Sequence, residues 1–287
     1  MIRIIYLDID GTLRDEEKGV PKSAVQALLK CRESGIRIVV CTGRNPGSIQ
    51  DDVWALDPDG VISGGGCYIS FQGKRLRERY FSEGLLKDTV SIAQELSLSL
   101  AMETEQHIYM DDEASRFYQE DFQHKICGCS KKRSGEVLTQ NKISYEANLN
   151  QLWESTEKIH KVCIFGKRHD IEQVEKKLAQ AAEPVQKKEW NGRWYLELLP
   201  KGCQKGAAVT WLNGWLGISK SDSMSFGDGE NDIAMLQATG AAVAMGDSSP
   251  LVRRYASHVC EPAAEDGIYK ELTRQGIIGT IYGERSS

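Results

Sequence analysis

The N-terminal part of the chain alternates short apolar runs with amphipathic segments. Three apolar runs predict buried strands, at residues 2–7, 36–41 and 60–63. Between them, helical spacing over residues 21–34, ending at Gly35, predicts one helix, and residues 49–56 predict a shorter one. Because strand, helix and strand follow at this spacing, we expect βαβ units and a parallel sheet.

The pattern changes after residue 75. Residues 75–82 are polar and charged without a clear element, whereas residues 83–96 and 171–182 predict amphipathic helices. Strands are expected at residues 98–103, 107–110 and 159–165, and residues 185–190 and 193–198 flank Asn191-Gly192, a strong hairpin signal. Residues 111–149 have little periodicity and receive no assignment. The segment predicts an α+β module with antiparallel strands and its helices on one face.

From Gly202 onward the alternation of strand and helix resumes. Helices are expected at residues 205–216, 233–238, 248–255 and 265–274, and strands at residues 223–226, 241–245 and 257–260. The predicted fold class is therefore α/β. Residues 1–81 and 201–287 would form a Rossmann-like core with a parallel sheet, and residues 82–200 an inserted α+β domain.

Composition narrows the class of protein. With 287 residues, 40% hydrophobic and 27% charged, the chain is typical of globular proteins, and its net charge of −5 argues against nucleic-acid binding. No apolar stretch is long enough to span a bilayer. Eight cysteines without a signal-peptide pattern favour reduced thiols in the cytoplasm. The pair in Cys127-Gly128-Cys129 has no second Cys or His pair nearby to complete a zinc site.

Two carboxylates close together follow the first predicted strand, in Asp8-Ile9-Asp10-Gly11-Thr12. Ligands of open α/β sheets bind at this carboxyl edge of the strands. Two acids this close repel each other, so they require a cation or a shared proton. The segment therefore predicts a metal-assisted active site in which one carboxylate can act as nucleophile. Taken alone, it would also fit an ordinary Asp-Gly turn.

Three other segments complete the chemistry of phosphoryl transfer. Thr42 ends the second strand, where a hydroxyl and backbone amides can bind a phosphate oxygen. Lys205 opens a helix, and Asp228 and Asp232 lie on a glycine-bracketed loop suited to a hard cation. Taken alone, Thr42 would also fit a helix cap, Lys205 a solvated surface lysine and residues 227–232 a calcium-type loop. Together they supply a nucleophile, a phosphate-binding group and a cation site.

The chain resembles the haloacid dehalogenase superfamily, specifically its Cof-type phosphatases with a large α/β cap. The resemblance extends from the first residues to about Met245, in the order and spacing of four motifs: Asp8-Ile9-Asp10-Gly11-Thr12-Leu13, Thr42-Gly43-Arg44, Lys205-Gly206 and Gly227-Asp228-Gly229-Glu230-Asn231-Asp232. One departure is that Ser63-Gly64 stands where many relatives carry Asn-Gly.

The resemblance implies a role for each motif residue. Asp8 would attack phosphorus and form an aspartyl-phosphate, Asp10 would act as general acid and base, and Thr42 and Lys205 would hold the phosphoryl group. Mg²⁺ would be bound by Asp8, the main-chain carbonyl of Asp10 and Asp228, with Asn231 and Asp232 in support. Residues beside the substrate phosphate would be Gly11, Thr12, Gly43 and Arg44.

The expected activity is a magnesium-dependent phosphatase for small phosphorylated metabolites, such as sugar phosphates or phosphorylated cofactors. A sugar phosphomutase and a catalytically silent phosphate-ligand binder are the alternatives. The cap would close over the site and exclude large substrates. Specificity would lie in the cap, at residues 111–149 or at Glu103, His107 and Tyr109, which also fit ordinary strand positions. We expect a monomer or homodimer, with no nucleic-acid or membrane partner.

Overall fold

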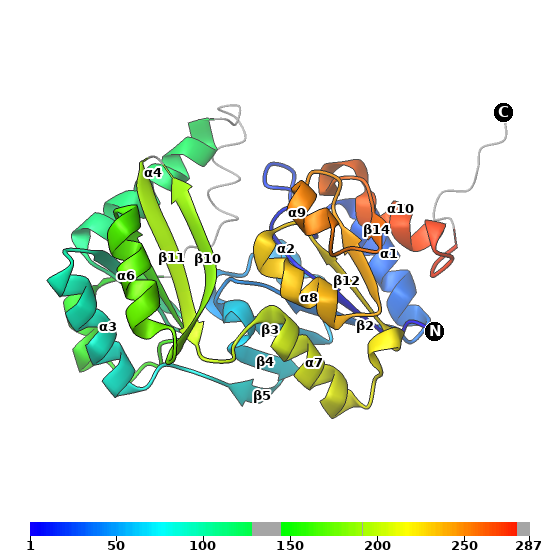
Figure 1. Cartoon of the computed structure of the whole chain (residues 1–287). Coiled ribbons are helices and arrows are strands. Elements are labelled where there is room, and N and C mark those ends of the chain that lie inside the picture. Colours follow the sequence, from blue (N-terminus) through cyan, green and yellow to red (C-terminus); the bar gives the residue numbers. More distant parts are fainter. Residues whose placement is uncertain (128–144, 191, 280–287) are drawn as a thin grey trace.

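Two β-sheets lie side by side in the computed structural model, which describes residues 1–127, 145–190 and 192–279 (Figure 1). The larger sheet has eight strands. In spatial order they are β14 (His258–Val259), β13 (Ala241–Ala244), β12 (Ser223–Gly227), β1 (Ile4–Leu7), β2 (Arg37–Cys41), β3 (Gly60–Ser63), β4 (Tyr68–Phe71) and β5 (Lys74–Glu78). From β14 to β3 neighbouring strands are parallel, as the sequence predicts.

Strand β1 lies inside this sheet, and helices cover both of its faces. Ile5 and Leu7 belong to the core cluster of α1 (Lys22–Glu33) and α10 (Gly267–Arg274). Ile4 and Tyr6 belong to the cluster of α7 (Lys205–Leu216) and α8 (Ile233–Ala238) on the opposite face. A strand buried on both faces requires a continuous apolar run, which explains the pattern at the start of the sequence.

The second sheet has six strands, all from the inserted segment. In spatial order they are β10 (Ala182–Trp190), β11 (Arg193–Pro200), β9 (Lys161–Gly166), β6 (Ser99–Glu103), β7 (His107–Met110) and β8 (Tyr145–Asn148). Helices α3 (Glu83–Glu95) and α6 (Arg168–Leu178) share one core cluster with one face of this sheet. We propose the predicted limits, residues 1–81 and 201–287 for the core and 82–200 for the cap, as the domain boundaries.

A hairpin at the edge of the large sheet is missing from the sequence interpretation. Strands β4 and β5 pair antiparallel and turn at Gln72 and Gly73, both with positive φ. Strand β5 carries Lys74, Arg75 and Arg77 and none of its residues is fully buried, so it shows no apolar periodicity. Charged edge strands of this kind prevent pairing with other chains. Two predicted helices are also shorter than expected, namely α2 (Asp51–Trp54) and α9 (Pro250–Arg253).

A helix in the weakly periodic segment corrects the expectation that all cap helices share one face. Helix α4 (Asp112–Cys127) packs Phe117 against Phe165, with ring centroids 4.5 Å apart, on the face opposite α3 and α6. The side chains that this helix packs against in the Phe117 cluster come from four strands, so local sequence spacing does not reveal the contact. Residues 128–144, including most of the Cys127-Gly128-Cys129 motif, lie outside the described residues.

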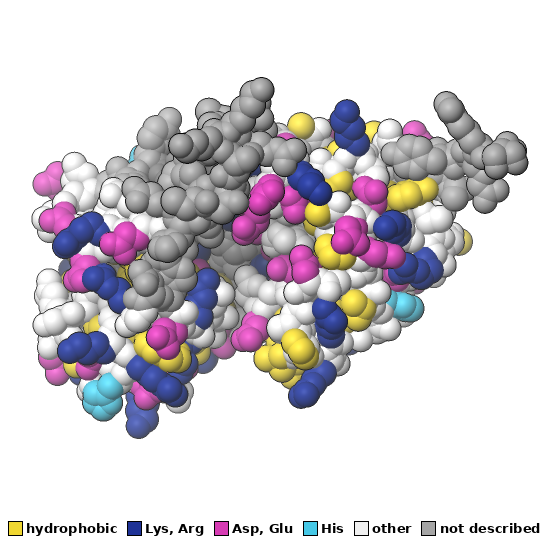
Figure 2. Space-filling view, turned by 90° about the horizontal axis from the view of Figure 1, so that it is seen from above, with side chains coloured by type: hydrophobic (Ala, Val, Ile, Leu, Met, Phe, Trp, Pro, Cys, Tyr) yellow, Lys and Arg dark blue, Asp and Glu magenta, His cyan; other side chains and the backbone are white. Residues whose placement is uncertain are grey.

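The charged surface residues and the cysteines are arranged as the composition predicts. On the face that Figure 2 shows, Lys and Arg side chains are interspersed with Asp and Glu. Within the described ranges no helix has the length and apolarity needed to cross a membrane. Six cysteines in the same ranges are buried and free, at positions 31, 41, 67, 163, 203 and 260.

The contact between α7 and α8 predicts a large stability difference between two glycine substitutions in α7. A Cβ at Gly206 would lie 2.1 Å from the carbonyl oxygen of Ala234, whereas nothing lies within 4 Å of a Cβ at Gly214. We expect Gly206→Ala to destabilise the fold by about 1–3 kcal/mol or more, because backbone must move. Gly214→Ala should stabilise it by up to about 1 kcal/mol. Urea unfolding of both variants measures the difference, and equal stabilities would contradict the contact.

Candidate active site

Four segments that are distant in sequence meet at the carboxyl edge of the large sheet. Asp8 directly follows β1, Thr42 follows β2, and Asp228 follows β12, while Lys205 is the first residue of α7. Strand β1 pairs with β2 on one side and β12 on the other, so the chain connections diverge at this point. Such a divergence opens a crevice at the strand ends, where ligands of α/β folds bind.

Lys205 connects the first and last motifs. Its Nζ lies 2.6 Å from Asp8 Oδ1 and 2.6 Å from Asp232 Oδ1, and the residue is only 3% exposed. Burial lowers the pKa of this ammonium, but Asp232 and Asp8 outweigh that effect and hold the pKa above its usual value. Lys205 is therefore a buried, charged group of the site and not a solvated surface lysine.

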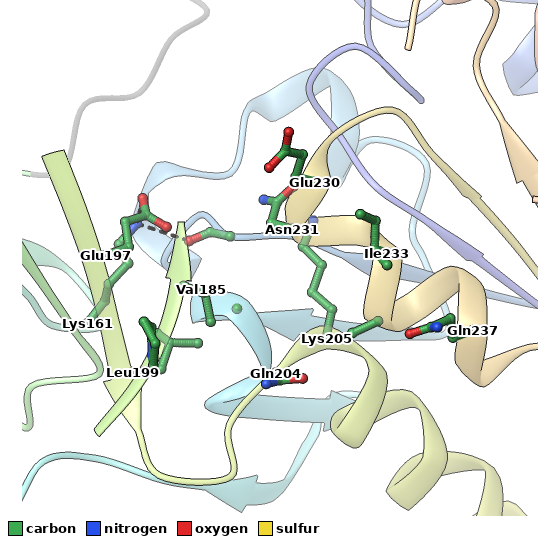
Figure 3. Close-up of a pocket in the computed structure, with 14 residues that line it drawn as sticks. Lys161, Val185, Glu197, Leu199, Gln204, Lys205, Glu230, Asn231, Ile233 and Gln237 are labelled. Atoms are coloured by element: carbon green, nitrogen blue, oxygen red, sulfur yellow. Dashed lines mark hydrogen bonds and ion pairs between the residues drawn. The ribbon is translucent and has the colours of Figure 1, made fainter. Parts of the chain in front are cut away.

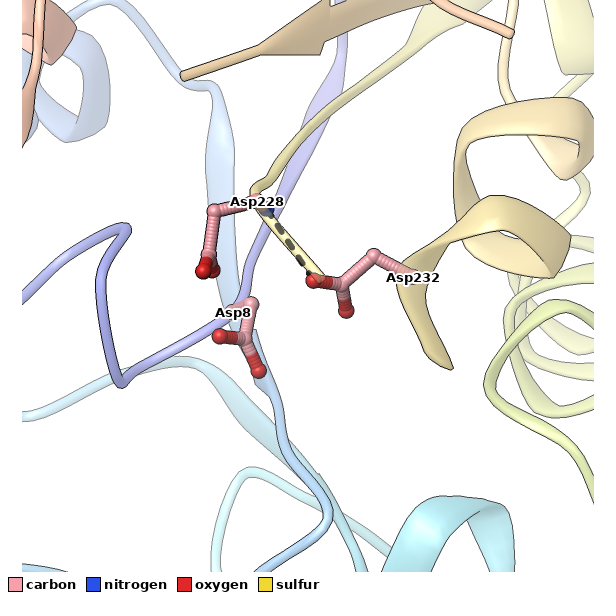
Figure 4. A group of neighbouring side chains, drawn as sticks. All are labelled: Asp8, Asp228 and Asp232. Atoms are coloured by element: carbon pink, nitrogen blue, oxygen red, sulfur yellow. Dashed lines mark hydrogen bonds between the residues drawn. The ribbon is translucent and has the colours of Figure 1, made fainter. Parts of the chain in front are cut away.

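Asp8, Asp228 and Asp232 form a carboxylate cluster (Figure 4). One oxygen from each lies within 4.8 Å of the others. Asp232 Oδ2 accepts hydrogen bonds from the backbone N–H groups of Asp228 (3.1 Å) and Gly229 (3.0 Å), while its Oδ1 accepts from Lys205. Both oxygens of Asp232 thus already accept hydrogen bonds from neighbouring groups. Asp8 and Asp228 are therefore better placed than Asp232 to bind a cation.

The electrostatics of this cluster fit a divalent cation. Burial, followed by the charge of Asp232, raises the pKa of Asp8 well above its usual range, although Lys205 opposes the shift. The same two causes raise the pKa of Asp228 to about 7. Carboxylates hold protons this strongly when their negative charges are insufficiently compensated. A hard cation bound by these oxygens would supply the missing positive charge.

The turn after β1 holds Asp228 in place. Thr12 Oγ1 donates to Asp228 Oδ1 at 2.9 Å. Gly11 has φ +81°, and a Cβ there would lie 2.6 Å from Asp228 Oδ2, so only glycine fits this approach. Gly11 and Thr12, expected beside the substrate phosphate, are thus placed against a potential cation ligand.

Asp10 is bound by Arg44, the residue that ends the second motif. Arg44 Nε donates to Asp10 Oδ2 at 2.6 Å and its Nη2 donates to Asp10 Oδ1 at 2.9 Å. Burial raises the pKa of Asp10, but the hydrogen bonds and charge of Arg44 outweigh it and hold that pKa below its usual value. Arg44 was expected beside the substrate, and in this structure its guanidinium orients Asp10.

Thr42 and its neighbours offer hydrogen-bonding groups at the edge of the site. Thr42 is 1% exposed, and its Oγ1 accepts from the backbone N–H of Arg44 at 3.1 Å, which leaves the hydroxyl proton for an incoming oxygen. It is not a helix cap. Ser63, the residue at which the sequence departs from the expected family pattern, has a buried hydroxyl with no hydrogen-bond partner among the described residues.

A cavity of about 290 Å³ lies between the core and the cap (Figure 3). Lys205, Asn231 and Gly43 line its core side, so it is continuous with the catalytic motifs. Lys161 and Glu197 line its cap side. Asn231, expected as a supporting metal residue, is therefore a cavity residue in this structure.

Lys161 and Glu197 are absent from the sequence interpretation, although a signal for them exists. On β9, Lys161 shares a face with Cys163 and Phe165, whereas Val162 and Ile164 belong to the face that α3 and α6 cover. The other residues of this strand are apolar on both faces, so a lysine among them is unusual. That charged residue is the signal from which the sequence could have indicated a functional position. Lys161 Nζ lies 2.9 Å from Glu103 Oε1 and 3.4 Å from Glu197 Oε1.

The three cap candidates from the sequence separate into two groups. Glu103 faces the cavity side of the sheet through its ion pair with Lys161. His107 Nδ1 and Tyr109 Oη instead lie 2.9 Å and 2.5 Å from Glu157 Oε2. Tyr109 packs in the cluster of α3 and α6, on the opposite face, so it is an ordinary structural residue of its strand.

Comparisons with known proteins agree with this geometry. Residues 5–272 match the family model described as haloacid dehalogenase-like hydrolase. A putative phosphatase, YkrA of Bacillus subtilis, is 24% identical over 96% of this chain and 98% of its own length. An HMP-PP phosphatase of Escherichia coli is 28% identical over 90% of this chain and 89% of its own length.

A solved structure shows the same fold. BT1666, a phosphatase of the same superfamily from Bacteroides thetaiotaomicron, superimposes with a TM-score of 0.77 at 24% identity. The alignment covers 97% of this chain and 96% of that one. Because the family model spans nearly the whole chain, the protein belongs to the haloacid dehalogenase-like hydrolases, as the motifs predict.

The raised pKa of Asp228 predicts that cation affinity depends on pH. Below about pH 7 this carboxyl is mostly protonated without a bound cation, so binding must displace the proton. We expect the affinity for Mg²⁺ to fall by up to about tenfold per unit below pH 7. Titration calorimetry in buffers of different ionisation enthalpy measures affinity and proton release. In Asp228→Asn binding should be weaker and less pH-dependent; pH-independent binding by the wild type would contradict the assignment.

Proposed function

We propose that this protein is a magnesium-dependent phosphatase that hydrolyses small phosphorylated metabolites through an aspartyl-phosphate on Asp8. The observation that carries the proposal is the buried Lys205, bonded to Asp8 at 2.6 Å, beside the carboxylate of Asp228. This arrangement provides a nucleophile, a positive charge for the phosphoryl group and a cation site in one crevice. Two full-length relatives are named phosphatases.

In the first step an oxygen of Asp8 forms a bond to phosphorus while the ester bond to the leaving oxygen breaks. Lys205 holds Asp8 Oδ1 and so orients the carboxylate for attack. The hydroxyl of Thr42 and the backbone amides of residues 9 and 10 hold phosphoryl oxygens. Asp8, the main-chain carbonyl of Asp10 and Asp228 would hold Mg²⁺, which would supply charge neutralisation for the phosphoryl group.

Asp10 transfers protons in both steps. It gives a proton to the leaving oxygen, and in the second step it takes one from the water that attacks the aspartyl-phosphate. The proton count is therefore restored after each turnover. Arg44 binds both oxygens of Asp10 and stabilises its anionic form, which takes the proton from water in the second step. The first step requires a protonated Asp10, so its contact with Arg44 must loosen when the substrate binds.

The proposed substrates are sugar phosphates or phosphorylated cofactors of comparable size. A cavity of about 290 Å³ is near the small end of the range of ligand-binding pockets, which suits a small metabolite. The free, buried cysteines at the described positions fit a reducing cytoplasm as the place of action.

The first test is phosphate release from sugar phosphates, nucleotides and cofactor phosphates, with Mg²⁺ and with EDTA. We expect release that requires Mg²⁺, since the buried carboxylates otherwise repel the substrate phosphate. No release from any ester would contradict the proposal. Activity that appears only with a sugar bisphosphate activator would indicate a phosphomutase, and ligand binding without turnover a silent binder.

The nucleophile assignment predicts a selective loss of activity in Asp8→Asn. An amide cannot form the acyl phosphate, so turnover should fall at least about a thousandfold. The melting temperature should stay equal or rise, because the substitution removes one of several mutually repelling carboxylates. Asp88→Asn makes the same substitution at an exposed position on α3, so it is the matched control for the type of substitution and for expression. Near-normal turnover in Asp8→Asn would show that another group is the nucleophile.

A further inference from the structure

The cavity beyond Lys205 is the space available to the leaving group of a substrate. Its apolar walls come from both domains, with Val185 and Leu199 on the cap hairpin and Ile233 on α8. Polar groups at its ends are Gln204, Gln237 and Asn231, together with charged side chains from cap and core (Figure 3). A phosphoryl group held at Asp8 would direct the rest of the ester into this space.

The charges around the cavity are compensated or negative. Lys205 is bonded to two carboxylates, those of Asp8 and Asp232. Lys161 also faces two, because Glu103 and Glu197 lie 2.9 Å and 3.4 Å from its Nζ. Burial lowers the pKa of Lys161, but these two carboxylates outweigh it and keep the ammonium charged.

The three-residue group of Lys161, Glu103 and Glu197 therefore has no net positive charge, even with one carboxyl protonated. Glu230 adds an exposed carboxylate on the core side. Among the described residues that line the cavity, no cation lacks a carboxylate partner. An anionic substituent on the leaving group would enter a partly buried space without a counter-charge, which is costly.

Glu197 also offers a hydrogen-bond acceptor. Its Oε1 accepts hydrogen bonds from the Lys161 ammonium and the Tyr195 hydroxyl. No hydrogen-bond donor for its Oε2 is found among the described residues, and Glu197 lines the cavity. Lys161 Nζ also donates to the carbonyl of Gly43 in the core at 3.3 Å. Lys161 therefore holds the Glu197 carboxylate of the cap in a fixed position relative to the core. Hydroxyl or amino donors of a leaving group suit such an acceptor.

From this arrangement we infer that the enzyme selects phosphate esters whose leaving group is uncharged or cationic and carries hydrogen-bond donors, with Glu197 as the specificity-determining acceptor. Leaving groups with a carboxylate or a second phosphate are discriminated against. The inference rests on the proposed phosphatase function and adds to it a class of substrate.

The test compares three esters that share the same transferred group and similar size. They are glucosamine 6-phosphate, glucose 6-phosphate and 6-phosphogluconate, with cationic, neutral and anionic leaving groups. We expect kcat/KM for the first two to exceed that for the third by at least about tenfold, the effect of roughly 1.4 kcal/mol. An equal or higher value for 6-phosphogluconate would overturn the inference. This arm uses the wild-type enzyme and requires no variant to fold.

Variants then identify the residue responsible. Glu197→Gln should lower the ratio of kcat/KM for glucosamine 6-phosphate to that for 6-phosphogluconate by about tenfold. Glu230→Gln, at an exposed position, should shift the ratio in the same direction to a smaller extent. Glu189→Gln, on the same cap hairpin but exposed, is the matched control and should leave the ratio unchanged. An unchanged ratio in a folded Glu197→Gln enzyme would remove Glu197 from the assignment.

A fourth ester separates this inference from the proposed function. para-Nitrophenyl phosphate has a leaving group without hydrogen-bond donors or an additional charge. Mg²⁺-dependent hydrolysis of it, together with no preference among the three sugar esters, would overturn the selectivity and leave the phosphatase proposal in place. No hydrolysis of any of the four esters would count against the phosphatase itself.

Discussion

The Lys205 ammonium, buried between the carboxylates of Asp8 and Asp232, is the interaction on which the rest of the site depends. It brings the end of β1, the start of α7 and the loop after β12 within hydrogen-bond distance of one cation. Without that charge, the carboxylates of a buried cluster would repel each other and favour protonation. Lys205 also lines the cavity, so it links the proposed nucleophile to the proposed space for the substrate.

The loop after β2 is hydrogen-bonded to the cap and also lies beside this centre. Asn45 Nδ2 donates to the carbonyl of Thr104 at 2.9 Å, Gly47 N donates to that of Glu105 at 2.9 Å, and Lys161 donates to that of Gly43. A Cβ at Gly47 would lie 2.9 Å from the Glu105 oxygen, so the approach is close. Thr42 and Arg44 lie in the same loop, which means that cap contacts and the proposed phosphate-binding groups share one short segment.

Much of the fold and most of the residues that meet at the sheet edge were predictable from the sequence, because their signals are local. A strand buried on both faces must be apolar throughout, as β1 is, and a carboxylate at its end must lie at the sheet edge. The edge hairpin β4–β5 and helix α4 were not predictable in this way. Strand β5 of the first is charged and only partly buried, and Phe117 of the second packs on residues from distant strands.

The sequence by itself determined the α/β class, the inserted domain and the motif residues from Asp8 to Asp232, since these depend on periodicity and on residue type at strand ends. Only the tertiary structure decided what each side chain contacts. It paired Arg44 with Asp10, Thr12 with Asp228 and Lys161 with Glu103. These contacts join residues from separate strands and from two domains, and a one-dimensional pattern contains no information about which of them meet across a cleft.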